Sequence, residues 1–441
     1  MTQPKSIPIT PSTAENHATS SKFHDILAKE RTGWRRFSWI IWALIGPGLL
    51  AMIGDNDAGG VVEYAVTGIQ FGIGLFIPLI LCLAPLTFTI QEMTMRLSAV
   101  TQTGYTKLVF RHFGRFFGYY SIGTLMIENL LTLMTEFIGM TAGLMMFGLP
   151  LWISDLMSLI LVVSLAIFTG YWTKERLALF VGALNGVFLI IALLTHPSMS
   201  AIGHAFIAWT IPKGMGNLLI WFIVATVGNA IAPWMIFFQG SAAIDKGITS
   251  KELKLGRIDT LLGSVLQVII AVAILLCGAS LYGHIHNASA LGPAAIIQAL
   301  TPTSGRAASI LFGFGLFNAG FLAAITISLS SSWTVADAFG FARSLNDRIS
   351  TAPKFYAVYI GSLVFAALAI LIPGLPLNFI AVLSQAMGAM VMIPILIFLV
   401  VLTSSRKIMG EFANGPILRV WGFAIASILI GLTIALLTQV I

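Results

Sequence analysis

The chain has 441 residues, of which 57% are apolar and 9% charged, whereas a soluble globular protein has about 45–50% and about 25%. So few charges cannot cover a water-exposed surface, which excludes a soluble multidomain protein and indicates a chain that lies mostly in lipid. The net charge of +7 does not indicate nucleic-acid binding, because the basic residues flank apolar segments and form no continuous patch. Cys82 and Cys277 lie far apart in apolar segments, which excludes a disulfide framework and a cysteine-based metal site.

Apolar segments long enough to cross a bilayer, about 20 residues each, recur along the chain. Residues 1–38 are polar and rich in serine and threonine, and they predict a cytoplasmic tail rather than a signal peptide. The remaining pattern predicts eleven transmembrane helices, approximately 39–68, 72–97, 116–145, 151–170, 177–195, 216–243, 258–282, 306–336, 355–373, 377–402 and 418–440. The predicted fold is therefore that of an all-α integral membrane protein.

The positive-inside rule orients these helices. With a cytoplasmic N-terminus, 22 of the 24 lysine and arginine residues fall in the tail or in cytoplasmic loops, and only Lys213 and Arg306 fall outside. An odd number of helices then places the C-terminus outside the cytoplasm. We therefore expect a multi-pass protein of the inner or plasma membrane.

The first predicted span contains the most informative stretch of the sequence, from Gly46 to Gly60. A proline, several glycines, Asp55 and Asp57 make a continuous helix costly there, since an interior glycine costs about 1 kcal/mol and an interior proline about 3 kcal/mol. At membrane depth such backbone survives only where it lines a cavity or packs against protein. The stretch predicts an interrupted helix in preference to a loop between two shorter helices.

The sixth predicted span contains a second interruption, from Gly228 to Trp234. Pro233 removes one backbone hydrogen bond and frees carbonyl groups for coordination. Interruptions in the first and sixth spans are typical of inverted-repeat transporters, in which half-helix ends meet at a midplane site. We therefore expect a first repeat over 39–195, a second, inverted repeat over 216–402, and an additional helix over 418–441.

The charges predicted within the membrane are negative, which favours a cation as the transported solute. They are Asp55, Asp57, Glu63, Glu92, Glu128 and Glu136. Glu92 and Arg96 are four residues apart near a helix end, which predicts a local ion pair rather than a ligand. For Glu63 the sequence leaves two positions open, the outer mouth of the transporter or a packed helix interface.

The third predicted span carries a polar stripe on one helical face. Its members are Glu128, Asn129, Thr132, Thr135 and Glu136. Two interpretations stay open, a water or ion path and hydrogen bonding to neighbouring helices. In the tenth span, Gln385 is another buried amide. The sequence does not distinguish a metal ligand from a residue that hydrogen-bonds to neighbouring helices.

The Gly46–Gly60 stretch resembles the first helix of the Nramp family of divalent-metal transporters. The resemblance extends over nearly the whole chain, through 136–139, 257–259 and 383–385. It implies eleven or twelve spans in a LeuT-like fold of two inverted five-helix repeats, with discontinuous helices 1 and 6. In that family an Asp-Pro-Gly-Asn motif in helix 1 and a Met-Pro-His motif in helix 6 form the metal site.

Both metal-site motifs depart from the family pattern. Asp57 keeps the family's aspartate, whereas Gly60 replaces the ligand asparagine and Ala232 replaces the ligand methionine. Trp234 and Gln239 replace two histidines that the resemblance assigns to proton handling. Leu133 stands in place of the family's acidic partner in helix 3, and the family's arginine pair in helix 9 is absent. This combination resembles the Nramp-related magnesium transporter branch.

The chemistry of these replacements also favours a hard cation. A methionine thioether favours Mn²⁺, Fe²⁺ or Cd²⁺ over Mg²⁺, so losing it removes that discrimination. Replacing asparagine and methionine by glycine and alanine is expected to widen the pocket, which suits Mg²⁺ because this ion usually keeps several waters. Candidate metal ligands are Asp57, Asp55, Gly60, Ala232, Gln385 and Asn229, and candidate pathway residues are Glu136, Glu128, Thr132, Trp234 and Gln239.

The sequence thus predicts a secondary-type transporter of Mg²⁺, and also of Mn²⁺, that moves a largely hydrated ion by alternating access without proton coupling. The alternatives are a proton-coupled Mn²⁺/Fe²⁺ transporter of the Nramp family and a LeuT-fold symporter of an organic solute. An enzyme is not expected, because no metal-protease motif, Ser/His pairing or phosphate loop stands in a suitable context. We expect a monomer without a resident cofactor, whose partners are divalent cations and the lipid bilayer, and no nucleic acid.

Overall fold

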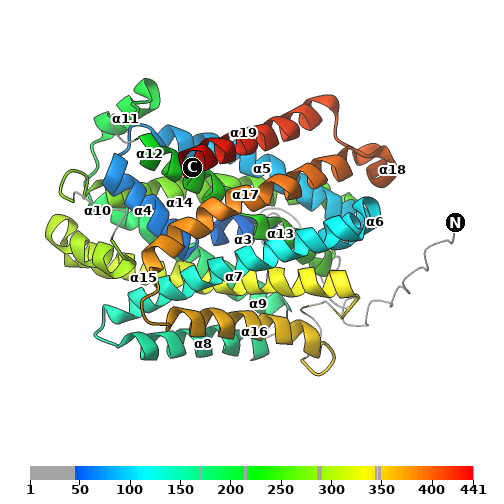
Figure 1. Cartoon of the computed structure of the whole chain (residues 1–441), viewed down its shortest axis with the longest axis horizontal. Helices are drawn as coiled ribbons and strands as arrows, with labels where there is room; N and C mark the ends of the chain where they lie inside the picture. Colours follow the sequence, from blue (N-terminus) through cyan, green and yellow to red (C-terminus); the bar gives the residue numbers. More distant parts are fainter. Residues whose placement is uncertain are drawn as a thin grey trace, which may run out of the picture.

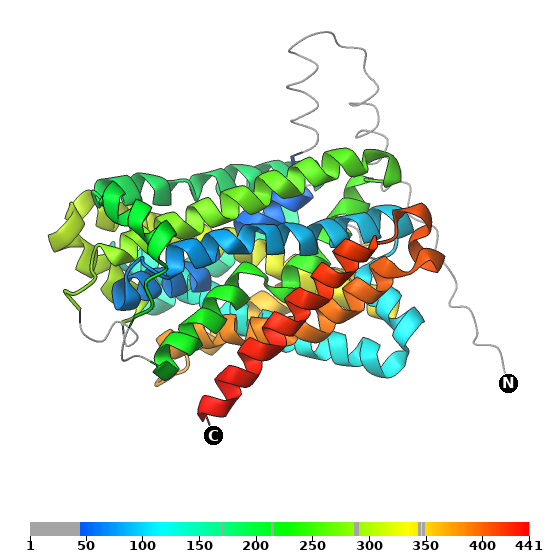
Figure 2. The same cartoon turned by 90° about the horizontal axis from the view of Figure 1, so that it is seen from above.

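The structure, a computed structural model, describes residues 45–168, 171–212, 216–285, 291–342, 345 and 349–440. Within these ranges the regular structure is helical, and most of the long helices lie roughly along one common axis in a single bundle, which α19 crosses at an angle (Figures 1 and 2). The predicted tail, residues 1–38, and the first residues of the first predicted span, 39–44, lie outside the described residues.

The helices keep the order of the predicted spans. The first half of the chain contains α3 Pro47–Gly54, α4 Ala58–Phe71, α5 Phe76–Thr101, α6 Tyr105–Phe113, α7 Arg115–Met145, α8 Leu151–Phe168, α9 Tyr171–Leu184, α10 Val187–Leu194 and α11 Met199–Ala208. The second half contains α12 Gly216–Ala230, α13 Pro233–Lys246, η1 Ser250–Glu252, α14 Leu253–Ala279, α15 Pro293–Phe339, α16 Pro353–Ile370, α17 Leu377–Ser404, α18 Arg406–Met409, η3 Gly410–Phe412 and α19 Pro416–Val440.

Helices occupy all eleven predicted spans, but the number of membrane crossings stays a prediction. Among the described residues, nine helical segments are long and apolar enough to cross a membrane, and two of them, Thr173–Leu194 and Gly216–Lys246, combine consecutive helices (α9 with α10, and α12 with α13). The two short helices of the first predicted span, α3 and α4, are not among the nine, and α8 contributes a shorter apolar stretch, Leu151–Leu165. The predicted orientation and the division into two repeats also stay predictions.

Three predicted loops contain α-helices that the apolar pattern does not predict. α6 lies between the second and third predicted spans, α11 lies between the fifth and sixth, and the four-residue α18 lies between the tenth and eleventh. α15 begins at Pro293 rather than near residue 306, and it is interrupted at Gly305, whose φ of 87° is not helical. A search for apolar segments of bilayer length overlooks such short helices, because they do not need to cross the membrane.

Both predicted helix interruptions are confirmed. The first break (residues 55–57) separates α3 from α4, and the second break (residues 231–232) separates α12 from α13. Pro233 occupies the first position of α13, where its missing N–H leaves no hydrogen bond unmade. The dense glycines and the proline therefore end these helices where the sequence indicated.

Close helix contacts bring α14 against the first break. α14 packs along α3, α4 and α5, and its backbone touches that of α4. A Cβ atom added to Gly68 would lie 2.7 Å from the backbone nitrogen of Ala279, so only glycine allows this approach. Gln267, in the middle of α14, thereby faces the two breaks.

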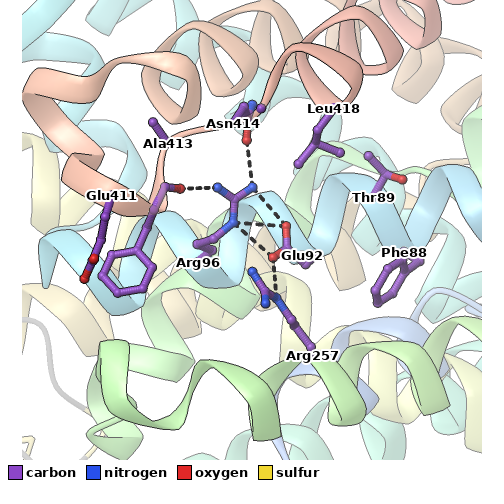
Figure 3. Close-up of a pocket in the computed structure, with 11 residues that line it drawn as sticks. Phe88, Thr89, Glu92, Arg96, Arg257, Glu411, Ala413, Asn414 and Leu418 are labelled. Atoms are coloured by element: carbon purple, nitrogen blue, oxygen red, sulfur yellow. Dashed lines mark hydrogen bonds and ion pairs between the residues drawn. The ribbon is translucent and has the colours of Figure 1, made fainter.

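The predicted ion pair between Glu92 and Arg96 is confirmed, with 3.0 Å between Oε1 and Nε. Arg257 of α14 joins it, at 2.8 Å from the same carboxylate (Figure 3). Arg96 also donates to the backbone oxygen of Phe412 and to Asn414, at 2.5 and 2.7 Å. A cavity of about 440 Å³ lies beside this cluster, which ties α5 to α14 and to the connection that leads into α19.

Candidate functional site

The two breaks lie side by side, and Gln267 of α14 joins them. Its Nε2 donates to the Asp55 carboxylate and, over 3.0 Å, to the backbone oxygen of Ala230 at the end of α12. Its backbone oxygen accepts from Asn56 Nδ2 at 3.1 Å. The Trp234 ring packs at the end of α3, since a Cβ atom on Gly54 would lie 3.3 Å from it. Residues of both breaks therefore form one site.

Asp57 is the N-cap residue of α4. Its backbone is extended, and its Oδ1 accepts from the N–H of Gly60 at 2.5 Å and from Gln385 Nε2 at 3.2 Å. The positive end of the helix dipole stabilises a carboxylate at this position. Only 1% of Asp57 is exposed, so its carboxylate lies inside the protein. A cation bound there would compensate its negative charge.

Asp57 is the centre of a buried acidic cluster. It interacts electrostatically with Asp55, Glu63, Glu128 and Glu136, and all five side chains are buried. In the part of the chain that the structure describes, none of the five forms a salt bridge. Buried charge without a partner is costly, so these carboxylates require compensation by bound protons or by a cation.

Glu136 and Asn129, members of the polar stripe on α7, bond to neighbouring helices. Glu136 Oε2 accepts from the N–H of Ala58 at 2.9 Å and so helps to cap α4. Asn129 Nδ2 donates to Ser331 Oγ of α15 at 2.8 Å. These contacts favour the hydrogen-bonding interpretation for this part of the stripe.

Glu128 has a different environment. Thr132 donates to its Oε1 at 3.0 Å, while its Oε2 is buried without a hydrogen-bond partner. A Cβ atom on Gly388 of α17 would lie 3.8 Å from Glu128 Oε1 and 3.6 Å from Pro233. Glu128 therefore lies near the second break with one oxygen free.

Glu63 lies in a packed helix interface and not at an outer mouth. Its carboxylate accepts from Thr67 at 2.9 Å and from Thr226 and Asn229 of α12 at 2.7 and 3.4 Å. None of its surface is exposed. Glu63 therefore connects α4 to α12 beside the breaks.

The expected widening of the pocket at Gly60 is wrong. A Cβ atom on Gly60 would lie 2.7 Å from Asn229 Nδ2 and 2.9 Å from its Cγ, so the side chain of Asn229 already fills this space. The Oδ1 of Asn229 is buried and has no hydrogen-bond partner. The replacement of asparagine by glycine at position 60 does not indicate that the space is filled, because Asn229, the residue that fills it, belongs to another helix, α12.

Of the candidate site residues on and beside α13, Ala232 and Trp234 lie at the second break, whereas Gln239 lies elsewhere. Ala232 precedes α13 as its N-cap residue and is buried at the second break, and Trp234 packs against Phe238 with ring centroids 6.1 Å apart. Gln239 donates to Thr260 Oγ1 at 2.8 Å, beside the first turn of α3. The structure therefore does not bring Gln239 to either break.

The first turn of α3 is anchored by charged groups. The Asp259 carboxylate accepts from the N–H groups of Gly46, Gly48 and Leu49 at 3.1, 2.7 and 3.3 Å. Nearby, Lys246 forms a buried ion pair with Glu175, 2.9 Å long. These contacts hold α3 against α9, α13 and α14.

The donor atoms at the breaks are oxygens. Among the described residues, no three His, Cys, Asp or Glu side chains converge closely enough to hold a metal ion by themselves. Several buried oxygens there lack hydrogen-bond partners: Asp55 Oδ1, Asn56 Oδ1, Glu128 Oε2, Asn229 Oδ1 and Gln267 Oε1. A few carboxylate and amide oxygens, completed by water, suit a hard cation.

Sequence similarity extends over nearly the whole bundle. The family model described as "Natural resistance-associated macrophage protein-like", Nramp, matches residues 48–439. The divalent metal cation transporter MntH of Listeria innocua is 24% identical over 440 residues, which cover 96% of this chain and 95% of that protein.

Solved structures show the same fold. A crystal structure of the Eremococcus coleocola manganese transporter matches with a TM-score of 0.74 at 19% identity, over 93% of this chain and 89% of that one. The structure of MhsT in complex with L-phenylalanine matches with a TM-score of 0.55 at 16% identity, over 89% and 97%. The described bundle thus shares its fold with a manganese transporter and with a protein solved in complex with L-phenylalanine.

Proposed function

Because this chain belongs to the Nramp family, whose members are transporters, we propose that it carries divalent cations across a membrane by alternating access. Mg²⁺ is the principal ion and Mn²⁺ is also carried. The ion moves largely hydrated and down its electrochemical gradient, without proton coupling. The relatives named for manganese or for divalent metal cations support the general class of substrate.

The observation that carries the choice of ion is the donor set at the breaks. Asp55, Asp57 and Asn229 offer carboxylate and amide oxygens, and Ala232 offers no sulfur at the second break. Without a soft ligand the site has no means of favouring Mn²⁺ or Cd²⁺ strongly over Mg²⁺. With few direct protein ligands, Mg²⁺ keeps several of its waters.

The absence of proton coupling is proposed from the side chains on α13. Trp234 carries no titratable group, and the amide of Gln239 is bonded to Thr260. Leu133 on α7 is buried and apolar. A proton-coupled Mn²⁺/Fe²⁺ transporter is the second candidate, because Glu128 retains one buried oxygen without a partner near the second break.

The test compares two buried aspartates in proteoliposomes loaded with a Mg²⁺-sensitive dye. Asp57→Asn should reduce Mg²⁺ uptake to the level of empty liposomes, because it removes the charge at the centre of the acidic cluster. Asp155→Asn on α8 is the control, since Asp155 is also buried with an unpartnered oxygen but lies on another helix. Wild-type uptake by a correctly folded Asp57→Asn variant would refute the assignment.

A further inference from the structure

Gln267 is an amide with apolar neighbours on both sides in α14, and only 1% of it is exposed. Its Nε2 donates to the carboxylate of Asp55 and to the backbone oxygen of Ala230, and its own backbone oxygen accepts from Asn56. Both partners of Nε2 are acceptors, which fixes the orientation of the amide. One residue of α14 thus holds groups at both breaks in place.

This orientation leaves two oxygens without hydrogen bonds. Gln267 Oε1 is buried and has no partner, and the same is true of Asp55 Oδ1, the oxygen that Gln267 does not bind. Buried acceptors in folded proteins normally have a donor or an ordered water. Two unsatisfied oxygens on one hydrogen-bonded pair, beside a cluster of carboxylates, point to a positively charged ligand.

We propose that Gln267 Oε1 and Asp55 form an oxygen subsite for the transported divalent cation, next to Asp57, and that Gln267 contributes to ion selectivity. This inference rests on the proposed function. An amide carbonyl is a hard, neutral ligand, which Mg²⁺ binds directly or through one of its waters. Because the same amide is bonded to Ala230, an ion in this subsite also connects α3 to α12.

The competing interpretation is that Gln267 only holds the breaks together. Gln267→Met separates the two, because methionine has a similar length but replaces the hard oxygen with a soft sulfur. If Oε1 faces the ion, the preference among ions changes. If Gln267 is only structural, the uptake of all ions falls by the same factor.

The experiment measures initial uptake of Mg²⁺, Mn²⁺ and Cd²⁺ over a range of concentrations in proteoliposomes. Gln267→Met should raise KM for Mg²⁺ about tenfold, which corresponds to about 1.4 kcal/mol, and should change KM for Mn²⁺ and Cd²⁺ much less. Gln267→Leu, which supplies neither oxygen nor sulfur, should raise KM for all three. Gln91→Met on α5 is the matched control, since Gln91 is also buried with an unpartnered Oε1 and forms no described hydrogen bond to either break.

An unchanged Mn²⁺:Mg²⁺ ratio in a folded Gln267→Met protein would overturn the inference. If that variant does not fold, Gln267→Glu decides, because a second carboxylate beside Asp55 should increase the thermal stabilisation that added Mg²⁺ provides. An equal or smaller stabilisation than in the wild type would count against the subsite. Failure of the proposed function has a separate signature: the wild type itself then takes up no Mg²⁺, and the Gln267 variants are compared on Mn²⁺ and Cd²⁺.

Discussion

The contact between Gly60 and Asn229 predicts that an amide at position 60 is tolerated only when the one at position 229 is removed. A Cβ atom on Gly60 would lie 2.7 Å from Asn229 Nδ2 and 2.9 Å from its Cγ, whereas non-bonded atoms prefer about 3.5–4.0 Å. Such overpacking typically costs about 1–3 kcal/mol. The better helix propensity of another residue recovers at most about 1 kcal/mol.

Gly60→Asn alone should therefore destabilise the protein and lower Mg²⁺ uptake. Asn229→Gly alone should keep the fold but weaken uptake, because it removes an unpartnered amide oxygen from the site. The double variant exchanges the positions of the two residues and should recover most of both losses. A coupling energy of about 0.5–3 kcal/mol between the positions is the range expected for residues in contact.

The assay combines thermal stability in detergent with Mg²⁺ uptake per folded protein for the two single variants and the double variant. Gly60→Ala and Gly431→Ala form a matched pair of controls. Gly431 lies in α19, where an added Cβ atom would meet nothing within 4 Å, so only Gly60→Ala should lower stability. A Gly60→Ala variant as stable as the wild type, or a double variant no better than Gly60→Asn, would show that Asn229 does not fill the space beside Gly60.

Further predictions concern the second break and the anchors of the helices. Ala232→Met adds a thioether at the second break and should shift preference towards Mn²⁺ in a competition assay, whereas an unchanged Mn²⁺:Mg²⁺ ratio would place selectivity elsewhere. Glu92→Gln leaves the buried Arg96 without its counter-charge and should cost about 3–5 kcal/mol of stability, measured as a lower thermal midpoint, with uptake per folded protein retained. Asp259→Ala removes the acceptor of three N–H groups in the first turn of α3 and should speed the labelling of a Leu49→Cys thiol; an unchanged rate would show that α3 is held by other contacts.

The interruptions could be predicted from the sequence because their signals are local. Glycine and proline weaken a helix wherever they stand, so the Gly46–Gly60 stretch and Pro233 marked both breaks without tertiary information. The pair formed by Glu92 and Arg96 was equally accessible, since residues four apart share a helix face. Local rules therefore predicted both breaks and this ion pair.

The details of the site depend on contacts between helices and could not be predicted in the same way. The filling of the space at Gly60 by Asn229 and the bond from Gln239 to Thr260 join different helices. Gln267 could have been recognised from the sequence, because it is a single amide among apolar residues in the middle of a predicted span. A polar residue at such a position is a functional candidate. Its connection to Asp55 became visible only once α14 was packed against the first break.

The most direct test of the proposed transport measures Mg²⁺ uptake and lumenal pH together in proteoliposomes under a negative-inside potential. The proposed function predicts saturable Mg²⁺ uptake by the wild type that Mn²⁺ inhibits, without acidification of the lumen, and no uptake of leucine or alanine. Acidification in fixed proportion to the Mg²⁺ taken up would contradict uncoupled transport. Uptake of Mn²⁺ with none of Mg²⁺ would contradict the assignment of the ion.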